Sequence, residues 1–261
     1  VDASLASFLG LLGFADDIAE PAGEPLNALG SQLAALEHML ASAIEKLNVR
    51  VEEIRQSGSL IDFHNALTAK LLIKIYSATG ARPLRDPFCS PRQFGFDDGT
   101  LFIDDKHSRK ARTGRLVPLP MSLMAEVQHS YLKHLSCVAN ALKASAPELS
   151  AAITTLAQGQ ESSRLPFFFV LSTGPGKTIS WRHASEKHLR ELDLFDCPLP
   201  LNLFRHRLAT RLRQDGVDPE LIDALLGHAE SGASTHGDHS FRIWKEDMDS
   251  LRAPLQSCLD A

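Results

Sequence analysis

The sequence predicts a mixed α+β fold that is mainly helical and carries a small three-stranded antiparallel sheet. Apolar residues recur at helical spacing through most of the 261-residue chain. The exception is the segment 93–119, where Asp98-Gly99 marks a hairpin turn between two short strand-like runs. A basic loop, 106–115, then leads into a third run, 116–119. These two hairpins share their middle strand, and together they predict the sheet.

Composition narrows the class of protein. With 44% hydrophobic residues the chain can bury a sizeable core, and it contains no apolar run near 18 residues, so no membrane-spanning helix and no membrane partner is expected. No secretory signal is evident. The four cysteines are scattered and form no CxxC pair, so we expect no zinc site and a reducing, cytoplasmic location. They are Cys89, Cys137, Cys197 and Cys258.

Charge is unevenly distributed along the chain. The net charge is −5, from 32 acidic and 27 basic residues. Residues 1–60 hold 9 of the acidic and 3 of the basic residues, which leaves 23 acidic and 24 basic residues in 61–261. Because the acidity lies in the first segment, the overall charge does not exclude a nucleic-acid partner for the rest of the chain. The slight basic excess predicts modest non-specific affinity for DNA.

Residues 1–60 are predicted to form a helical leader of undefined role. Within it, Asn27–Val51 carries an apolar stripe at helical spacing, which predicts either a packed helix or a face for a partner subunit. A glycine flanked by serines in Gln56–Ser59 is the best candidate for a boundary. The main domain is therefore expected to cover 61–261.

The middle of the chain is assigned by its periodicity and its turn residues. A helix is predicted for Phe63–Thr79, ending at Gly80 and delivering Arg82. Met121–Gln160 should be mostly helical, and Phe167–Leu171 should be a short strand or the buried entry to a loop. We expect a turn at Ser172–Lys177 and a further helix over Ile179–Leu194.

Two helices are predicted in Leu201–His228. The first runs from about Leu203 to Gln214, with Asn202 as its N-cap and Gly216 as its stop. The second begins at Asp218-Pro219 and ends at Gly227. Arg205 then projects from the first turn of one helix, and His228 follows the terminal glycine of the other.

Several motifs in this order resemble the tyrosine recombinase (phage integrase) family. They are Thr79-Gly80-Ala81-Arg82, a hairpin ending in Val117-Pro118-Leu119, Asn202-Leu-Phe-Arg205 and Leu226-Gly227-His228. The resemblance covers about 61–241. The chain departs from the family at Asn202, where histidine is usual, and at Arg85, where glutamate is usual.

The resemblance implies a fold and a chemistry. It implies the catalytic-domain fold of the family, which cleaves and rejoins DNA for site-specific recombination or integration through a 3′-phosphotyrosyl intermediate, with no cofactor and no metal. Arg82, Asn202, Arg205 and His228 would bind the phosphate, and Lys106, with Lys110 in reserve, would act as general acid. Planar, permanently charged guanidinium groups suit this transition state. The expected DNA contacts are Arg109, Lys110, Arg112, Arg115 and Arg207. We also expect Arg205→Ala to weaken phosphate binding while leaving the fold intact.

The nucleophilic tyrosine of that family is missing from its expected window. The chain has two tyrosines, Tyr76 and Tyr131; both precede the Leu226-Gly227-His228 motif and are interpreted as packing residues. In the window, the nucleophile position corresponds to His239 or to Phe241. A metal site built from His228, His236 and His239 is disfavoured, because no carboxylate or cysteine completes a typical ligand set.

Two classes of function therefore remain open. One is a recombinase catalytic domain whose nucleophile is absent or substituted, so that this chain does not cleave DNA. The other is a catalytically inactive DNA-binding or assembly protein that retains the fold. The family implies double-stranded DNA as partner, a homotetramer on that DNA and a prokaryotic, nucleoid-associated location. A C-terminal stripe either docks on a neighbouring copy or packs on its own domain; it consists of Trp244, Met248, Leu251 and Leu255.

Overall fold

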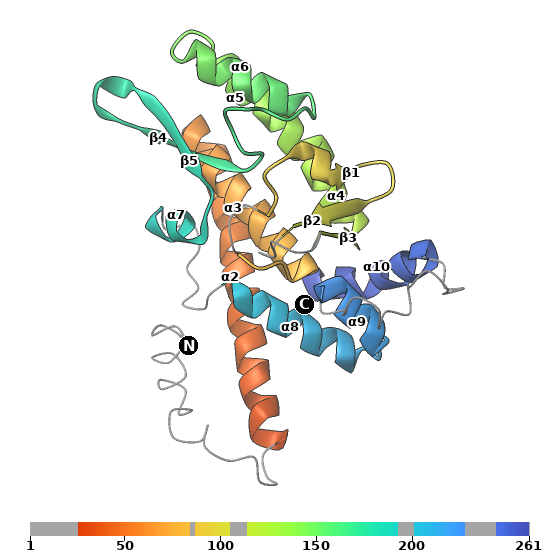
Figure 1. The fold of residues 1–261 in the computed structure, drawn as a ribbon. Helices are drawn as coiled ribbons and strands as arrows, with labels where there is room; N and C mark the ends of the chain where they lie inside the picture. The colour runs from red at the N-terminus through yellow and green to blue at the C-terminus, as the bar shows by residue number, and fades with distance from the viewer. Residues whose placement is uncertain (1–25, 84–86, 105–113, 193–200, 228–243, 261) are drawn as a thin grey trace.

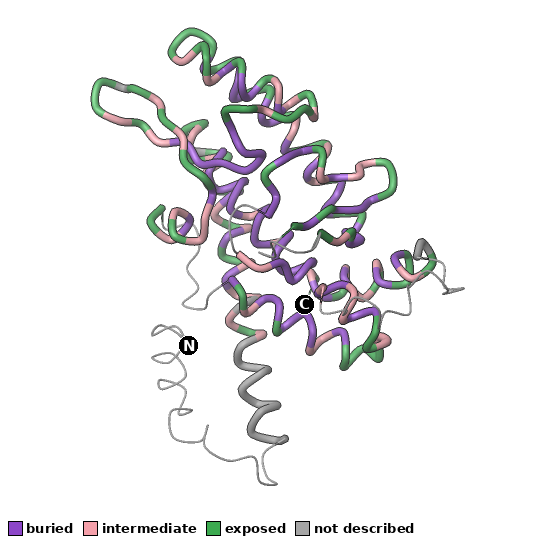
Figure 2. The backbone as a smooth tube through the Cα atoms, in the orientation of Figure 1, coloured by how far each residue is buried: buried purple, intermediate pink, exposed green. Residues whose placement is uncertain are grey.

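The computed structural model describes residues 26–83, 87–104, 114–192, 201–227 and 244–260. Within these ranges the chain is mainly helical, with one three-stranded and one two-stranded antiparallel sheet. Helix α3 (Leu60–Thr79) runs through the centre of the molecule and is buried along most of its length (Figures 1 and 2). It packs against α2, α5, β4, α8 and α10. The predicted α+β class with a small three-stranded sheet is confirmed.

Helix α2 (Leu26–Ser57) lies alongside α3 and shares its core. Ala43, Leu47 and Val51 of α2 are buried. The two helices meet at a turn where the Ser59 side chain caps α3 by accepting a hydrogen bond from the Asp62 backbone N–H. The predicted boundary at Gln56–Ser59 thus coincides with a turn, but the C-terminal half of α2 packs into the same core as the main domain.

The three-stranded sheet has the order predicted from its turns. It comprises β1 (Phe94–Gly95), β2 (Thr100–Ile103) and β3 (Arg115–Pro118), all antiparallel, with Leu101 opposite Phe94 on one side and Val117 on the other. Asp98 Oδ1 accepts hydrogen bonds from the backbone N–H and the hydroxyl of Thr100, which closes the β1–β2 turn. Gly99 completes that turn with φ +66°.

The region after the sheet is helical, as predicted for Met121–Gln160. It contains α4 (Met121–Ala125), a π-helical stretch (Glu126–Tyr131), α5 (Leu132–Leu142) and α6 (Pro147–Ala157). Helices α5 and α6 form an antiparallel pair above the sheet in Figure 1. The pair is joined by the Ser150 hydroxyl, which donates to the Ala139 carbonyl.

The prediction of one helix over Ile179–Leu194 is wrong. The structure has β4 (Phe169–Thr173), a turn at Pro175–Lys177, β5 (Ile179–His183) and only then α7 (Glu186–Glu191). Strand β5 pairs with β4 along its whole length. The outer edge of β4 is bound by Asn65 of α3, whose side chain accepts from the Leu171 N–H and donates to the Leu171 carbonyl. The hairpin pairing with β4, which Asn65 in turn holds against α3, overrides the local helical pattern of the first five residues.

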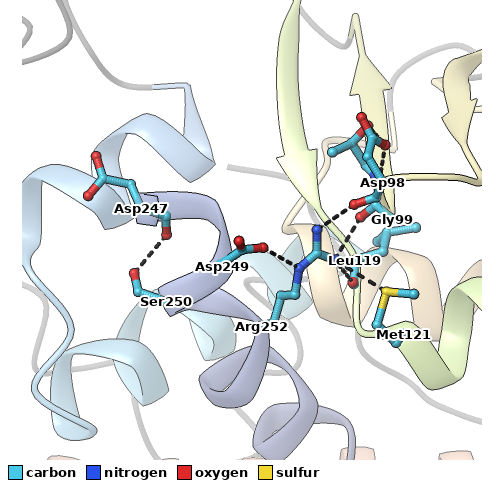
Figure 3. A network of polar contacts seen from close by, with 9 residues as sticks. Asp98, Gly99, Leu119, Met121, Asp247, Asp249, Ser250 and Arg252 are labelled. Carbon is cyan, nitrogen blue, oxygen red and sulfur yellow. Dashed lines mark hydrogen bonds and ion pairs between the residues drawn. The ribbon is translucent and has the colours of Figure 1, made fainter. Parts of the chain in front are cut away.

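The last helix, α10 (Trp244–Asp260), packs on the chain's own domain, against α3, α8 and β3. Met248, Leu251 and Leu255 are buried there, which is the local alternative predicted for this stripe; the Trp244 side chain lies outside the described residues. Figure 3 shows Arg252 joining α10 to the sheet through the backbone carbonyls of Asp98, Gly99 and Leu119. Among the helices that the structure describes, none is long and apolar enough to cross a membrane.

A buried histidine pair predicts how stability depends on pH. His64 and His134 stack with ring centroids 5.4 Å apart, and His64 Nε2 lies 3.1 Å from the Phe169 carbonyl. Burial lowers the pKa of His64 to about 3 and that of His134 to about 4. Protonation of His64 would add an N–H at Nδ1, for which no acceptor lies among the described residues.

We therefore expect the free energy of unfolding to fall as the pH drops below 6.5, by roughly 2 kcal/mol for each of the two histidines, or about 4 kcal/mol in all, between pH 7 and pH 5. The unfolded chain takes up protons near pH 6.5, whereas the folded chain resists protonation until about pH 3 to 4. Urea titrations at several pH values measure this slope, and His134→Phe should reduce it by removing one of the two groups. Equal slopes for both proteins would contradict the assignment.

Candidate functional site

The structure brings together segments that the sequence places more than a hundred residues apart. Arg205 of α8 (Asn202–Gln214) is 5% exposed. Its Nη1 donates to the Gly80 carbonyl at 2.8 Å, and its Nη2 donates to the Leu226 carbonyl at 2.6 Å. One guanidinium therefore joins the end of α3 to the end of α9 (Pro219–Leu226), and these are the two places where the resemblance puts Arg82 and His228.

Gly80 permits this close approach. It ends α3 with φ +56°, and a Cβ there would lie 2.8 Å from Leu226 Cδ2 and 3.3 Å from Leu208 Cδ2. A side chain would therefore push α8 and α9 away from α3. Thr79 supports the turn, because its hydroxyl donates to the Ile75 carbonyl and accepts from the Ala81 N–H. Arg82, two residues after Gly80, is half-buried.

Helices α8 and α9 begin and end nearly as the sequence predicts. The Asp218 carboxylate caps α9 by accepting from the Glu220 N–H, Pro219 is its first residue, and Gly227 ends it with φ +67°. The predicted cap of α8 is wrong by one position: Asn202 is the first residue of the helix, and Leu201 occupies the cap position without a side-chain hydrogen bond. Asn202 is exposed and lies one turn before Arg205.

Arg115 binds the same end of α9 from the sheet. Its Nε donates to the Leu225 carbonyl at 2.8 Å, and its side chain packs beside Gly227, where a Cβ would lie 3.2 Å from Arg115 Cδ. The prediction treated Arg115 as a DNA contact at the end of a basic loop. The contact with α9 was missed, because nothing in the local sequence indicates a partner 110 residues away.

The assignment of Arg207 as a DNA contact is corrected by its burial. This side chain is 4% exposed, and its Nη1 donates to the Cys258 carbonyl at 2.9 Å, which joins α8 to α10. Burial lowers the pKa of the Arg207 guanidinium, and the nearby Cys258 and Glu37 raise it. Helical spacing places Arg205 and Arg207 on different sides of α8, and the packing of α10 covers the side that carries Arg207.

The two tyrosines are core residues, as the sequence predicts. Tyr76 is 6% exposed and packs edge-on against Phe88 at 5.1 Å. Tyr131 is fully buried, its hydroxyl donates to the Phe167 carbonyl, and burial raises the pKa of its phenol. A buried phenol that resists ionisation is a poor nucleophile, and neither ring reaches the surface where DNA would bind.

Several predicted site residues lie outside the described residues, and their positions remain predictions. They are Lys106, Arg109, Lys110, Arg112, His228, His239 and Phe241. Of the cysteines, Cys137 and Cys258 are free thiols, and Cys197 lies outside the described ranges. No group of three or more His, Cys, Asp or Glu side chains in the described ranges is arranged to hold a metal ion.

The arrangement has a definite electrostatic character. The C-terminal carbonyls of a helix carry partial negative charge, and two arginines from different elements, Arg115 and Arg205, neutralise those of α9. The same guanidinium groups remain permanently charged and offer planar sets of donors. Fixed positive charge therefore lies beside the ends of α3 and α9.

Comparisons with protein-family models, with curated proteins and with solved structures find no match for this chain.

Proposed function

We propose that this chain is a tyrosine-recombinase-like domain that binds double-stranded DNA at the Arg205 cluster and, lacking the nucleophilic tyrosine, does not cleave it. The observation that carries the proposal is the contact of Arg205 with both Gly80 and Leu226. It joins three motifs that were identified separately in the sequence and whose order matches the family.

The chemistry proposed for the intact family site follows from the charges. Attack on a phosphodiester concentrates negative charge on the non-bridging oxygens, and preorganised donors stabilise that charge. Arg82 would supply guanidinium donors, and His228 and Asn202 would supply further donors. Arg205, whose Nη1 and Nη2 bind carbonyls of the chain, would add positive charge behind them. Lys106 would protonate the leaving 5′-oxygen. Asn202 can donate a hydrogen bond through its amide but cannot exchange a proton. We therefore expect the site to bind a phosphate better than it catalyses a reaction on it.

A second function class, a DNA-binding or assembly protein that never cleaves, is favoured by the burial of both tyrosines. Tyr76 and Tyr131 are packed in the core, so neither supplies a phenol to the cluster. The two classes predict the same DNA binding by this chain and differ only when a tyrosine is restored.

We expect duplex or junction DNA to bind with an affinity that falls steeply as salt rises. Each phosphate contact contributes about −0.9 to the slope of log affinity against log salt, and the site should give a slope steeper than about −2. Fluorescence anisotropy at several salt concentrations measures it. The triple substitution of Arg109, Lys110 and Arg112 by alanine should flatten the slope by roughly 2 to 3.

A matched control removes positive charge elsewhere. Lys133 and Lys143 are exposed on and just after α5. Replacing both with alanine changes the net charge by a similar amount and should leave the slope unchanged. Salt-independent binding, or no binding to any duplex, would instead favour a protein-interaction function.

A further inference from the structure

We propose that Arg115 is a positioning residue, which holds the end of α9, with Leu226 and Gly227 of the Leu226-Gly227-His228 motif, against the sheet and does not serve as a phosphate contact. The inference rests on the proposed function, because the motif matters only if it binds a phosphate. It changes the role of Arg115, which its place at the end of a basic loop would make one more phosphate contact.

The first support is the hydrogen bond that the Arg115 guanidinium makes with the end of α9. Arg115 is the first residue of β3 and is only partly exposed. Its Nε donates to the carbonyl of Leu225, the residue two positions before Gly227, at 2.8 Å. This bond turns the Nε edge of the guanidinium toward the end of a helix of the same chain and thereby fixes the Arg115 side chain beside that end.

The second support is the fit between Arg115 and Gly227. A Cβ on Gly227 would lie 3.2 Å from Arg115 Cδ and 3.4 Å from Arg115 Nη1. Gly227 also has φ +67°, which side chains rarely adopt. Glycine is therefore favoured by the left-handed end of α9, and its lack of a Cβ leaves room for the Arg115 side chain to lie across it.

The third support is that the end of α9 is held from two sides. Arg205 of α8 binds the Leu226 carbonyl, and Arg115 of β3 binds the Leu225 carbonyl. Consecutive carbonyls are thus fixed to two different elements, which determines where the chain leaves α9 relative to both.

The test separates positioning from phosphate contact by salt dependence and by rescue. We expect Arg115→Ala to weaken duplex binding by roughly tenfold at every salt concentration, with an unchanged slope, because no released counterion is lost. Arg115→Lys should not restore the affinity, since an ammonium lacks the Nε–H and the planar group that reach Leu225. In contrast, Arg112→Ala should flatten the slope by about 0.9, and Arg112→Lys should restore it. The proposal is overturned if Arg115 behaves as Arg112 does.

A second measurement needs no DNA and keeps the proposal separate from the proposed function. Amide hydrogen exchange of residues 224–227 should become at least about tenfold faster in Arg115→Ala and in Arg115→Lys, because the end of α9 frays when its carbonyl loses the donor. The Gly227 N–H, which donates to the Ala224 carbonyl at 3.0 Å, is the most direct reporter. Exchange in α5 serves as the internal control. If the unmodified chain fails to bind DNA, the proposed function is wrong. If amide exchange is unchanged in the two Arg115 variants, the positioning role of Arg115 is wrong.

Discussion

Restoring a tyrosine at position 239 or 241 is expected to convert a chain that holds DNA non-covalently into one that forms a covalent protein–DNA link. Neither the imidazole of His239 nor the ring of Phe241 offers the phenolic oxygen that a phosphotyrosyl intermediate requires. We expect one of the two variants, His239→Tyr or Phe241→Tyr, to give an adduct on a nicked suicide substrate. A denaturing gel detects the adduct, and the unmodified chain should give none.

The position at which tyrosine gives an adduct is the position of the nucleophile. The same variant then shows how strongly asparagine at position 202, in place of the family's usual histidine, affects the rate of adduct formation. In the responding variant, Asn202→His should accelerate adduct formation by roughly 10²–10⁴-fold, since it returns a group that can exchange a proton. Tyr131→Phe in the same background should leave adduct formation unchanged, because that ring is a buried core residue. If neither variant forms an adduct on DNA that it binds, the chain is a non-cleaving relative. An adduct formed by the unmodified chain would mean that Tyr76 or Tyr131 reaches the DNA.

Arg205→Ala is expected to lower the stability of the fold as well as the affinity for DNA. Arg205 is 5% exposed and donates to two carbonyls, those of Gly80 and Leu226. Removing the guanidinium leaves both carbonyls without these donors, at a cost of about 3 kcal/mol. For a domain of this size, thermal unfolding should shift down by roughly 10 °C, which differential scanning fluorimetry measures.

This expectation revises the sequence-based one, under which Arg205→Ala leaves the fold intact. Arg213→Ala is the matched control, since Arg213 is exposed near the end of the same helix and the substitution should leave the melting temperature nearly unchanged. Arg205→Lys should keep the charge but lose one of the two hydrogen bonds, and should lie between the alanine variant and the unmodified protein. Equal melting temperatures for Arg205→Ala and Arg213→Ala would show that the contacts with Gly80 and Leu226 contribute little.

Much of the fold is predictable because its signals are local. The glycines at 80 and 227 end helices through their own backbone freedom, and Asp218-Pro219 begins one through its own cap. The β1–β2 turn closes on its own Asp98 and Gly99. The prediction from periodicity fails for β5: the helix predicted over Ile179–Leu194 is present only at Glu186–Glu191. There the pairing with β4, itself anchored by Asn65 of α3, decides the conformation.

The sequence by itself determined where most of the helices and turns lie, because caps, turns and periodicity act over a few residues. Only the tertiary structure decided which backbone carbonyls each arginine contacts. Arg205, Arg207 and Arg115 all belong to basic stretches and carry the same side chain. Packing buries Arg205 between α3 and α9, places Arg207 under α10, and turns Arg115 toward the carbonyl end of α9. The role of a guanidinium depends on which carbonyls surround it, and those carbonyls come from parts of the chain that meet only on folding.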